Sequence, residues 1–162
     1  MNKTRLYLGA CLSLFIFSHA RGGFEIGNGR KTVENVKGRY SIVVPEKMEV
    51  GRSKSFTEIL GPLSEGTPRT RLHINVVNED SLLTLNDLID SKKDGWTSVK
   101  IAGLEGIQKE DVLPTRVHQI EIRLFLRPGQ VIVLNLEGAP GPSLMTPFES
   151  VKESLGSFKN LN

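Results

Sequence analysis

The residues from Thr115 to Gly138 constrain the fold of this chain more than any other stretch. They form two runs in which apolar residues alternate with other residues, and Arg127-Pro128-Gly129-Gln130 joins the runs. Such alternation places successive side chains on opposite faces of a β-strand. Proline and glycine favour the two central positions of a tight turn. The stretch therefore predicts a β-hairpin, which implies an antiparallel sheet with an apolar face that must be covered.

The pairing of the two strands can follow two registers. A two-residue loop would place Leu126 opposite Val131 and would mix the two faces of the hairpin. A shift by one residue would place Leu126 opposite Ile132 and Leu124 opposite Leu134, so that apolar residues face one another. We therefore expect the shifted register and a loop of odd length.

The first 20 residues have the order of a secretory signal peptide. Lys3 and Arg5 precede an apolar run of 12 residues, Leu6 to Phe17, and Ser18-His19-Ala20 places small residues before a cleavage site near Ala20. A bilayer core requires roughly 20 apolar residues, so a membrane anchor is disfavoured. We expect a periplasmic or secreted protein. Leu8-Gly9-Ala10-Cys11 also resembles a bacterial lipobox, so membrane association through a lipidated Cys11 stays open.

Removal of residues 1–20 changes the charge and the cysteine content of the chain. It takes away two bases and no acid, so 21 bases become 19 against 18 acids, and the net charge falls from +3 to +1. It also removes Cys11, the single cysteine, which excludes disulfides and cysteine catalysis in the mature chain. The nearly neutral mature chain lacks the clustered basic surface that binds nucleic acid.

The mature chain has the length of one domain. It would keep 142 of the 162 residues, enough for one substantial core. Residues 21–37 are rich in glycine and show no hydrophobic period, so we expect a flexible lead-in there. Residues 38–162 should then form a single α+β domain.

Shorter patterns complete the expected secondary structure. Strands are expected at residues 39–45, 53–60, 69–77, 99–101 and 106–113. One helix should begin at Thr84, with Asp87 in the capping position. Its apolar face would consist of Leu85, Leu88, Ile89 and Trp96.

A second helix should follow Thr146-Pro147, which supplies an N-cap and a proline at the first helical position. Its apolar stripe should lie on the sheet, with Leu155 buried against the hairpin and Ser154 on the polar side. The stripe consists of Phe148, Val151, Leu155 and Phe158.

Together these elements predict an α+β fold, with a mostly antiparallel β-sheet flanked by two helices in an α/β/α sandwich. The layout over residues 39–159 resembles that of the PsbP-like family. The residues that carry the likeness are Tyr40-Ser41-Ile42-Val43-Val44-Pro45, Thr84-Leu85-Asn86-Asp87-Leu88, Val131 to Leu136, and Phe148 to Phe158. Met48 is a departure, since many members have an aromatic residue soon after the proline.

The resemblance implies binding or scaffolding more than any shared chemistry. Relatives include a photosystem subunit, a Ran-binding protein, chaperones of secretion effectors and bacterial lipoproteins, and the family has no shared catalytic residue to transfer to this chain. The fold alone does not determine which of these functions a chain has.

The sequence shows no catalytic or metal-binding constellation. His73 and His118 are the two histidines beyond residue 20, and each stands alone in a predicted strand. A zinc site needs three or four ligands, so no metal or cofactor is expected. Glu110 and Asp111 are adjacent in a strand, so their carboxylates should point to opposite faces and cannot act jointly.

One polar patch is a candidate binding site. Arg71, His73, Gln119 and Arg123 would gather if their strands were neighbours, and such a patch would suit an anionic ligand or partner. We therefore expect an exported, non-enzymatic binding or scaffold protein, with a protein partner and no nucleic acid. Two alternatives stay open: a carrier of lipid or another apolar small molecule, and a small hydrolase or transferase whose site the sequence does not reveal.

Overall fold

The computed structural model describes residues 29–52, 56–63, 66–79, 84–90, 95–141 and 146–161. The expected signal peptide, Cys11 and residues 21–28 of the expected lead-in lie outside the described residues.

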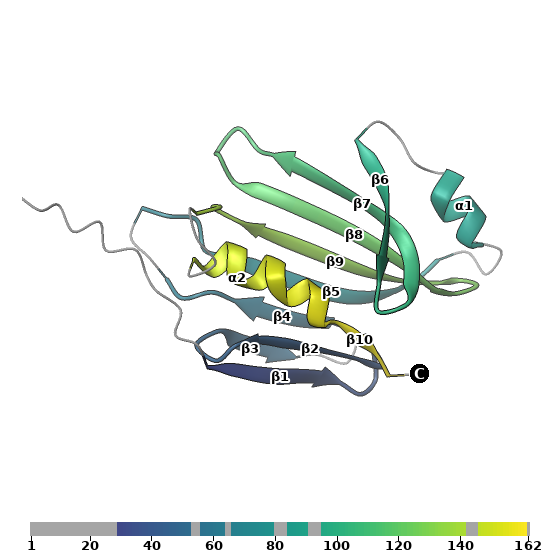
Figure 1. Ribbon diagram of the computed structural model, residues 1–162, viewed down its shortest axis with the longest axis horizontal. Coiled ribbons are helices and arrows are strands. Elements are labelled where there is room, and N and C mark those ends of the chain that lie inside the picture. The colour runs from purple at the N-terminus through teal and green to yellow at the C-terminus, as the bar shows by residue number, and fades with distance from the viewer. Residues whose placement is uncertain are drawn as a thin grey trace, which may run out of the picture.

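The described chain consists mainly of β-strands, with two short α-helices and one 3₁₀ turn (Figure 1). In chain order the elements are β1 (Arg30–Asn35), β2 (Tyr40–Pro45), β3 (Glu49–Arg52), β4 (Phe56–Leu60), β5 (Arg71–Asn78), α1 (Leu85–Asp90), β6 (Trp96–Ile101), β7 (Leu104–Val112), β8 (His118–Arg127), β9 (Gln130–Gly138), α2 (Pro147–Ser154), η1 (Leu155–Ser157) and β10 (Lys159–Asn160).

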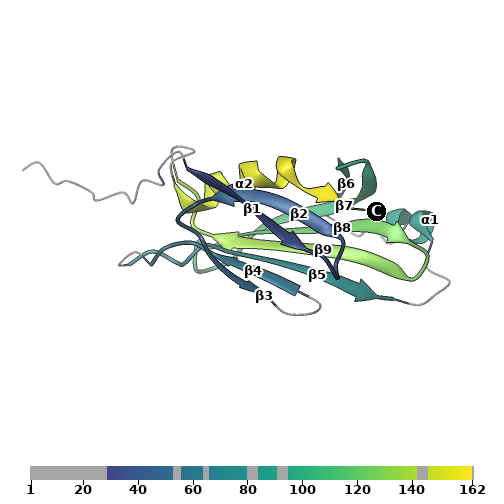
Figure 2. The same cartoon turned by 90° about the horizontal axis from the view of Figure 1, so that it is seen from below.

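The strands form a large and a small antiparallel sheet. The large sheet has seven strands in the order β3-β4-β5-β9-β8-β7-β6, and the small sheet has three in the order β1-β2-β10. The small sheet and α2 lie on the same side of the large sheet (Figure 2). We call this side the first face and the opposite side the second face. The expected α+β architecture is confirmed.

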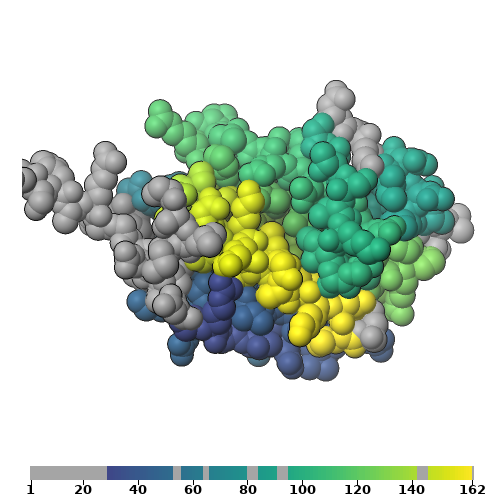
Figure 3. Space-filling model, in the orientation of Figure 1, coloured from purple at the N-terminus to yellow at the C-terminus, as the bar shows by residue number. Residues whose placement is uncertain are grey.

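The first face of the large sheet is the main core of the domain. Its apolar residues alternate along β5, β8 and β9, as the hairpin pattern predicts, and they include Leu72, Ile122 and Leu134. The small sheet and α2 cover them, and α2 lies between the small sheet and the β6–β7 end of the molecule (Figure 3). The expected stripe of α2 and η1 is confirmed, because all four of its residues are buried in this core.

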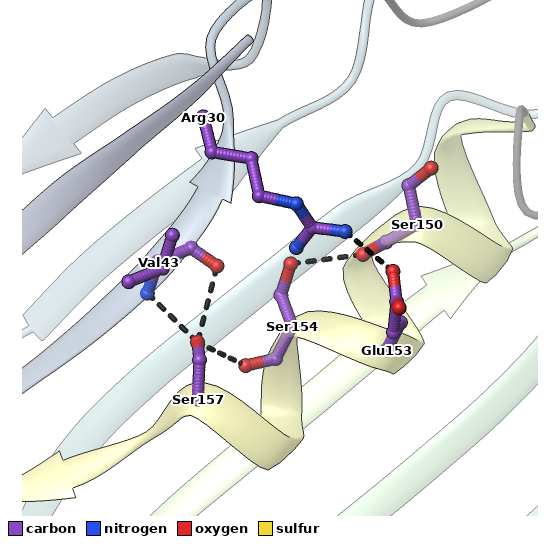
Figure 4. Close-up of polar contacts among 6 residues, drawn as sticks. All are labelled: Arg30, Val43, Ser150, Glu153, Ser154 and Ser157. Atoms are coloured by element: carbon purple, nitrogen blue, oxygen red, sulfur yellow. Dashed lines mark hydrogen bonds and ion pairs between the residues drawn. The ribbon is translucent and has the colours of Figure 1, made fainter. Parts of the chain in front are cut away.

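The second helix docks on the small sheet partly through serine hydroxyls (Figure 4). Ser157 Oγ accepts a hydrogen bond from the Val43 N–H at 2.9 Å and lies 2.6 Å from the Ser154 carbonyl oxygen. Ser154 was expected on the polar side, and this expectation is wrong, since the residue is fully buried. Its hydroxyl donates to the Ser150 carbonyl oxygen at 2.8 Å, so the polar group is satisfied inside the protein.

The predicted hairpin is β8–β9, but its register differs from the one expected. The loop has two residues, and Arg127 pairs with Gln130 across it. Gly129 has φ 76°, the left-handed value that a glycine in this turn readily adopts. A bulge between Phe125 and Arg127 then shifts the pairing, so that Leu124 lies opposite Ile132. The apolar faces match as expected, although the bulge rather than an odd-length loop makes them match.

Two further expectations about secondary structure are corrected. Residues 30–35 of the expected lead-in form β1, because the side chains of Val33 and Asn35 are buried against the rest of the domain. Trp96 does not belong to the first helix. It begins β6, directly after Gly95, which has a left-handed φ of 88°.

The cap of α1 is confirmed. The Asp87 carboxylate accepts hydrogen bonds from the Thr84 N–H at 2.7 Å and from the Thr84 hydroxyl at 2.6 Å, and these bonds lower the pKa of Asp87. Leu88 of α1 packs with Ile107 and Val131, which point away from α2. The two helices therefore lie on opposite faces of the large sheet.

Candidate binding site on the second face of the sheet

The second face of the large sheet carries a cleft over its three central strands. Residues that alternate with the core positions of β5, β8 and β9 point to this side, and the second-face residues are mostly polar. The cleft has a volume of about 460 Å³. Its lining consists of His73, Asn75, Val77, Glu79, Gln119, Glu121, Arg123, Val133 and Asn135.

An ion pair occupies the β8 wall of the cleft. Arg123 Nε lies 2.7 Å from Glu121 Oε1, and both side chains are partly buried. The Arg123 guanidinium also lies over the Trp96 ring, 5.6 Å from its centroid, in a cation–π arrangement. Two contacts therefore fix the orientation of Arg123, and much of its charge is compensated by Glu121.

Two buried amide oxygens lie in the lining of the cleft. Asn75 Oδ1 and Asn135 Oδ1 are inaccessible to solvent and have no hydrogen-bond partner among the described residues. Their strands are adjacent, with His73 opposite Asn135 and Asn75 opposite Val133. Leaving a polar atom buried and unpaired costs about 1–3 kcal/mol. A ligand that brings N–H or O–H donors would pair these oxygens if the two side chains turned toward the cleft.

The two histidines lie on opposite faces of the sheet. The His73 ring lies in the cleft lining, with its centroid 5.0 Å from that of Phe56. The His118 ring lies on the first face, 6.0 Å from the Phe148 ring and with Nδ1 3.9 Å from Glu110 Oε1. The expectation that they are separate is confirmed, so the pair cannot act on one substrate.

The adjacent carboxylates of β7 also point apart. Asp111 pairs with Lys109 at 2.8 Å, whereas Glu110 pairs with Lys152 of α2 at 3.2 Å. In the described parts of the chain, no three His, Cys, Asp or Glu side chains gather as metal ligands. The same described parts contain no helix long and apolar enough to cross a membrane.

The structure brings together three of the four residues of the predicted polar patch. His73, Gln119 and Arg123 line the cleft, whereas Arg71 lies on the same face outside the lining and pairs with Glu58 at 3.2 Å. The asparagine pair could not be located from the sequence alone. The alternation in β5 placed Asn75 with His73, but a unique strand order was needed to place Asn135 beside them.

Comparison with known proteins supports the fold. No protein-family model matches the sequence, and no curated protein is significantly similar to it. Among solved structures, the chain is similar to the Ran-binding protein Mog1p of Saccharomyces cerevisiae, with 10% identity, a TM-score of 0.50, and coverage of 83% of this chain and 96% of that one.

A protein of Bacteroides thetaiotaomicron is also similar, with 9% identity and a TM-score of 0.54. The match covers 80% of this chain and 48% of that chain, so this chain spans about half the length of that relative. At such low identity both matches define the fold and leave the site to be argued from its own residues.

Proposed function

We propose that this chain is an exported, non-enzymatic binding protein of PsbP-like fold, whose cleft receives hydrogen-bond donors of a protein partner. The observation that carries the proposal is the pair of buried, unpartnered oxygens of Asn75 and Asn135. A protein partner offers the matching donors on its backbone and side chains. Export rests on the order of residues 1–20, and the binding role is supported by the likeness to Mog1p, a Ran-binding protein.

The charges of the cleft favour a donor over an anion. Its ionisable lining includes Glu79 and Glu121 beside a single arginine, and that arginine is already paired with Glu121. An incoming anion would meet these carboxylates, whereas an amide, hydroxyl or ammonium group would not. The mostly polar lining also favours a protein partner over the apolar ligand of a carrier.

A double variant, Asn75→Val with Asn135→Val, tests the proposal. Both substitutions remove a buried unpaired amide and place a β-branched residue in a strand, so the free energy of unfolding should stay equal or rise by about 1–3 kcal/mol. Binding of the partner should be lost. Equal or higher stability together with lost binding is typical of residues in a binding site and not of residues that serve the fold.

The experiment is affinity capture from the native host with the wild-type chain and the variant, followed by mass spectrometry and thermal unfolding. Lys152→Ala, on the first face, is the matched control and should retain every partner. A partner that binds the double variant as well as the wild type would refute the cleft as its site. Variants that unfold more easily than the wild type would show that the two amides serve the fold.

A further inference from the structure

A second pocket lies at the other side of the sheet, where two turns meet. The turn between β1 and β2 and the turn between β8 and β9 lie at the same end of the molecule (Figure 1). The pocket between them has a volume of about 270 Å³. Its lining consists of Lys37, Gly38, Arg39, Val76, Leu126, Arg127 and Gln130. Val76 and Leu126 supply a small apolar part, and none of these residues belongs to the cleft on the second face.

All three ionisable residues that line this pocket are basic. Lys37 and Arg39 come from one turn and Arg127 from the other, more than 80 residues later in the sequence. Like charges repel, so bringing Lys37 and Arg127 to one small pocket costs free energy unless an anion compensates them. A cluster of cations around a concave, partly apolar surface is the arrangement that binds small anions.

The pocket is held in shape by neutral contacts. Arg127 Nε donates to Gln130 Oε1 at 2.8 Å, and Gln130 Nε2 donates in turn to Asn78 Oδ1 at 2.8 Å. This chain of bonds orients the guanidinium without neutralising its charge. A guanidinium has five N–H donors, so the Nε bond leaves four for an oxyanion.

The opposite wall is fixed as well. The Gly38 N–H donates to Asn35 Oδ1 at 2.8 Å, and the Arg39 carbonyl oxygen accepts from the Leu161 N–H at 2.7 Å. Arg39 adopts φ 54°, a left-handed conformation that is uncommon for a residue other than glycine. The backbone of this turn is thus anchored on both sides.

We propose that this pocket binds a small organic anion through its carboxylate or phosphate oxygens, with Lys37 and Arg127 as the binding cations. The bidentate geometry of an arginine suits both kinds of oxyanion, and Val76 and Leu126 provide an apolar surface for the rest of a small ligand. The site is independent of the cleft and of the function proposed for it.

The test uses inorganic phosphate and succinate as probes, with chloride at matched ionic strength as the reference. Binding is followed by the NMR shifts of the Gly38 and Gln130 amides and by thermal unfolding. The wild type should show saturable shifts with at least one probe, and Lys37→Ala with Arg127→Ala should weaken that binding at least about tenfold. Arg127→Lys should bind with intermediate affinity.

Arg116→Ala is the control, because Arg116 precedes β8 and lies at the opposite end of that strand from Arg127. It should leave binding unchanged. Saturation by phosphate alone would assign a phosphate ester, saturation by succinate alone would assign a carboxylate, and saturation by both supports a general oxyanion pocket. Shifts that do not exceed those of chloride, or that persist in the folded double variant, would overturn the proposal.

Discussion

The Tyr40 hydroxyl gives a sharp test of the polar contacts between the two sheets. Tyr40 is fully buried, and its hydroxyl donates to Thr57 Oγ1 at 2.7 Å. Asn35 Nδ2 donates to the same hydroxyl at 3.3 Å and also reaches Thr57 Oγ1 at 3.2 Å. Tyr40→Phe keeps the ring and its stacking on Phe158, 5.6 Å between centroids. It removes one hydroxyl while Asn35 and Thr57 retain each other.

We therefore expect a moderate loss of stability. One hydrogen bond contributes a net stabilisation of about 0.5–1.5 kcal/mol. Asn35 and Thr57 would also lose one of their partners, so Tyr40→Phe should lower the free energy of unfolding by about 1–2 kcal/mol. With a urea m-value of about 2 kcal/mol per molar, the unfolding midpoint should fall by roughly 0.5–1 M. Trp96, the single tryptophan, reports unfolding by its fluorescence.

The same variant should behave differently at alkaline pH. Burial raises the pKa of Tyr40 above its usual value of 10.0. The folded state then holds this proton more tightly than the unfolded state, so the stabilisation is complete below pH 10.0 and is lost as the pH rises through the folded pKa. The stability difference between wild type and Tyr40→Phe should therefore shrink above that pH.

Urea titrations of both chains at a series of pH values measure this difference. Titration of the lysines is common to both chains and cancels in the difference. Equal stability at neutral pH, or a difference that stays constant into the alkaline range, would refute the argument that the hydroxyl is buried and hydrogen-bonded.

Three further substitutions, the first with a control substitution, test the packing. Leu155→Ala should cost about 2–5 kcal/mol in urea unfolding because Leu155 is buried in the core, whereas Leu63→Ala, at an exposed leucine, should stay within about 0.5 kcal/mol. Gly106→Ala should prevent normal pairing of β7, since the new Cβ would lie 2.0 Å from a backbone oxygen of β8, and loss of the folded circular-dichroism signal checks this. Ser157→Ala should cost about 1–2 kcal/mol because it leaves the Val43 N–H unpaired, and faster hydrogen exchange of that amide would confirm the reason.

Much of the fold follows from the local pattern of polar and apolar residues. The wrong predictions concern positions where that pattern fits two structures equally well. The alternation around Leu124 and Leu134 identified the apolar face of the hairpin correctly. The bulge beside Leu126 was not predictable. It adds one residue to β8 and so matches the apolar faces, an effect that a loop of odd length would also produce. Trp96 fits a helical period and a strand equally well, and only its partner strand decides between them.

The candidate cleft was predictable only in part, for a topological reason. His73 and Arg123 were grouped on the supposition that their strands are close, and the strand order places β9 between them. That intervening strand brings Asn135 into the lining. The basic pocket was beyond prediction, since it joins Lys37 and Arg127 from two turns whose proximity depends on how the sheets pack.

The edge of β2 is closed by residues that are synthesised long after it. Ser157 contacts Val43 and Lys159 pairs with Ser41, separations of more than 110 residues. Until residues 147–160 have left the ribosome, β2 has an unpaired edge and its apolar side chains lack the cover of α2. Such late, long-range closure slows folding. For a chain that is exported as we propose, this order of events delays completion of the small sheet until residues 147–160 have been synthesised.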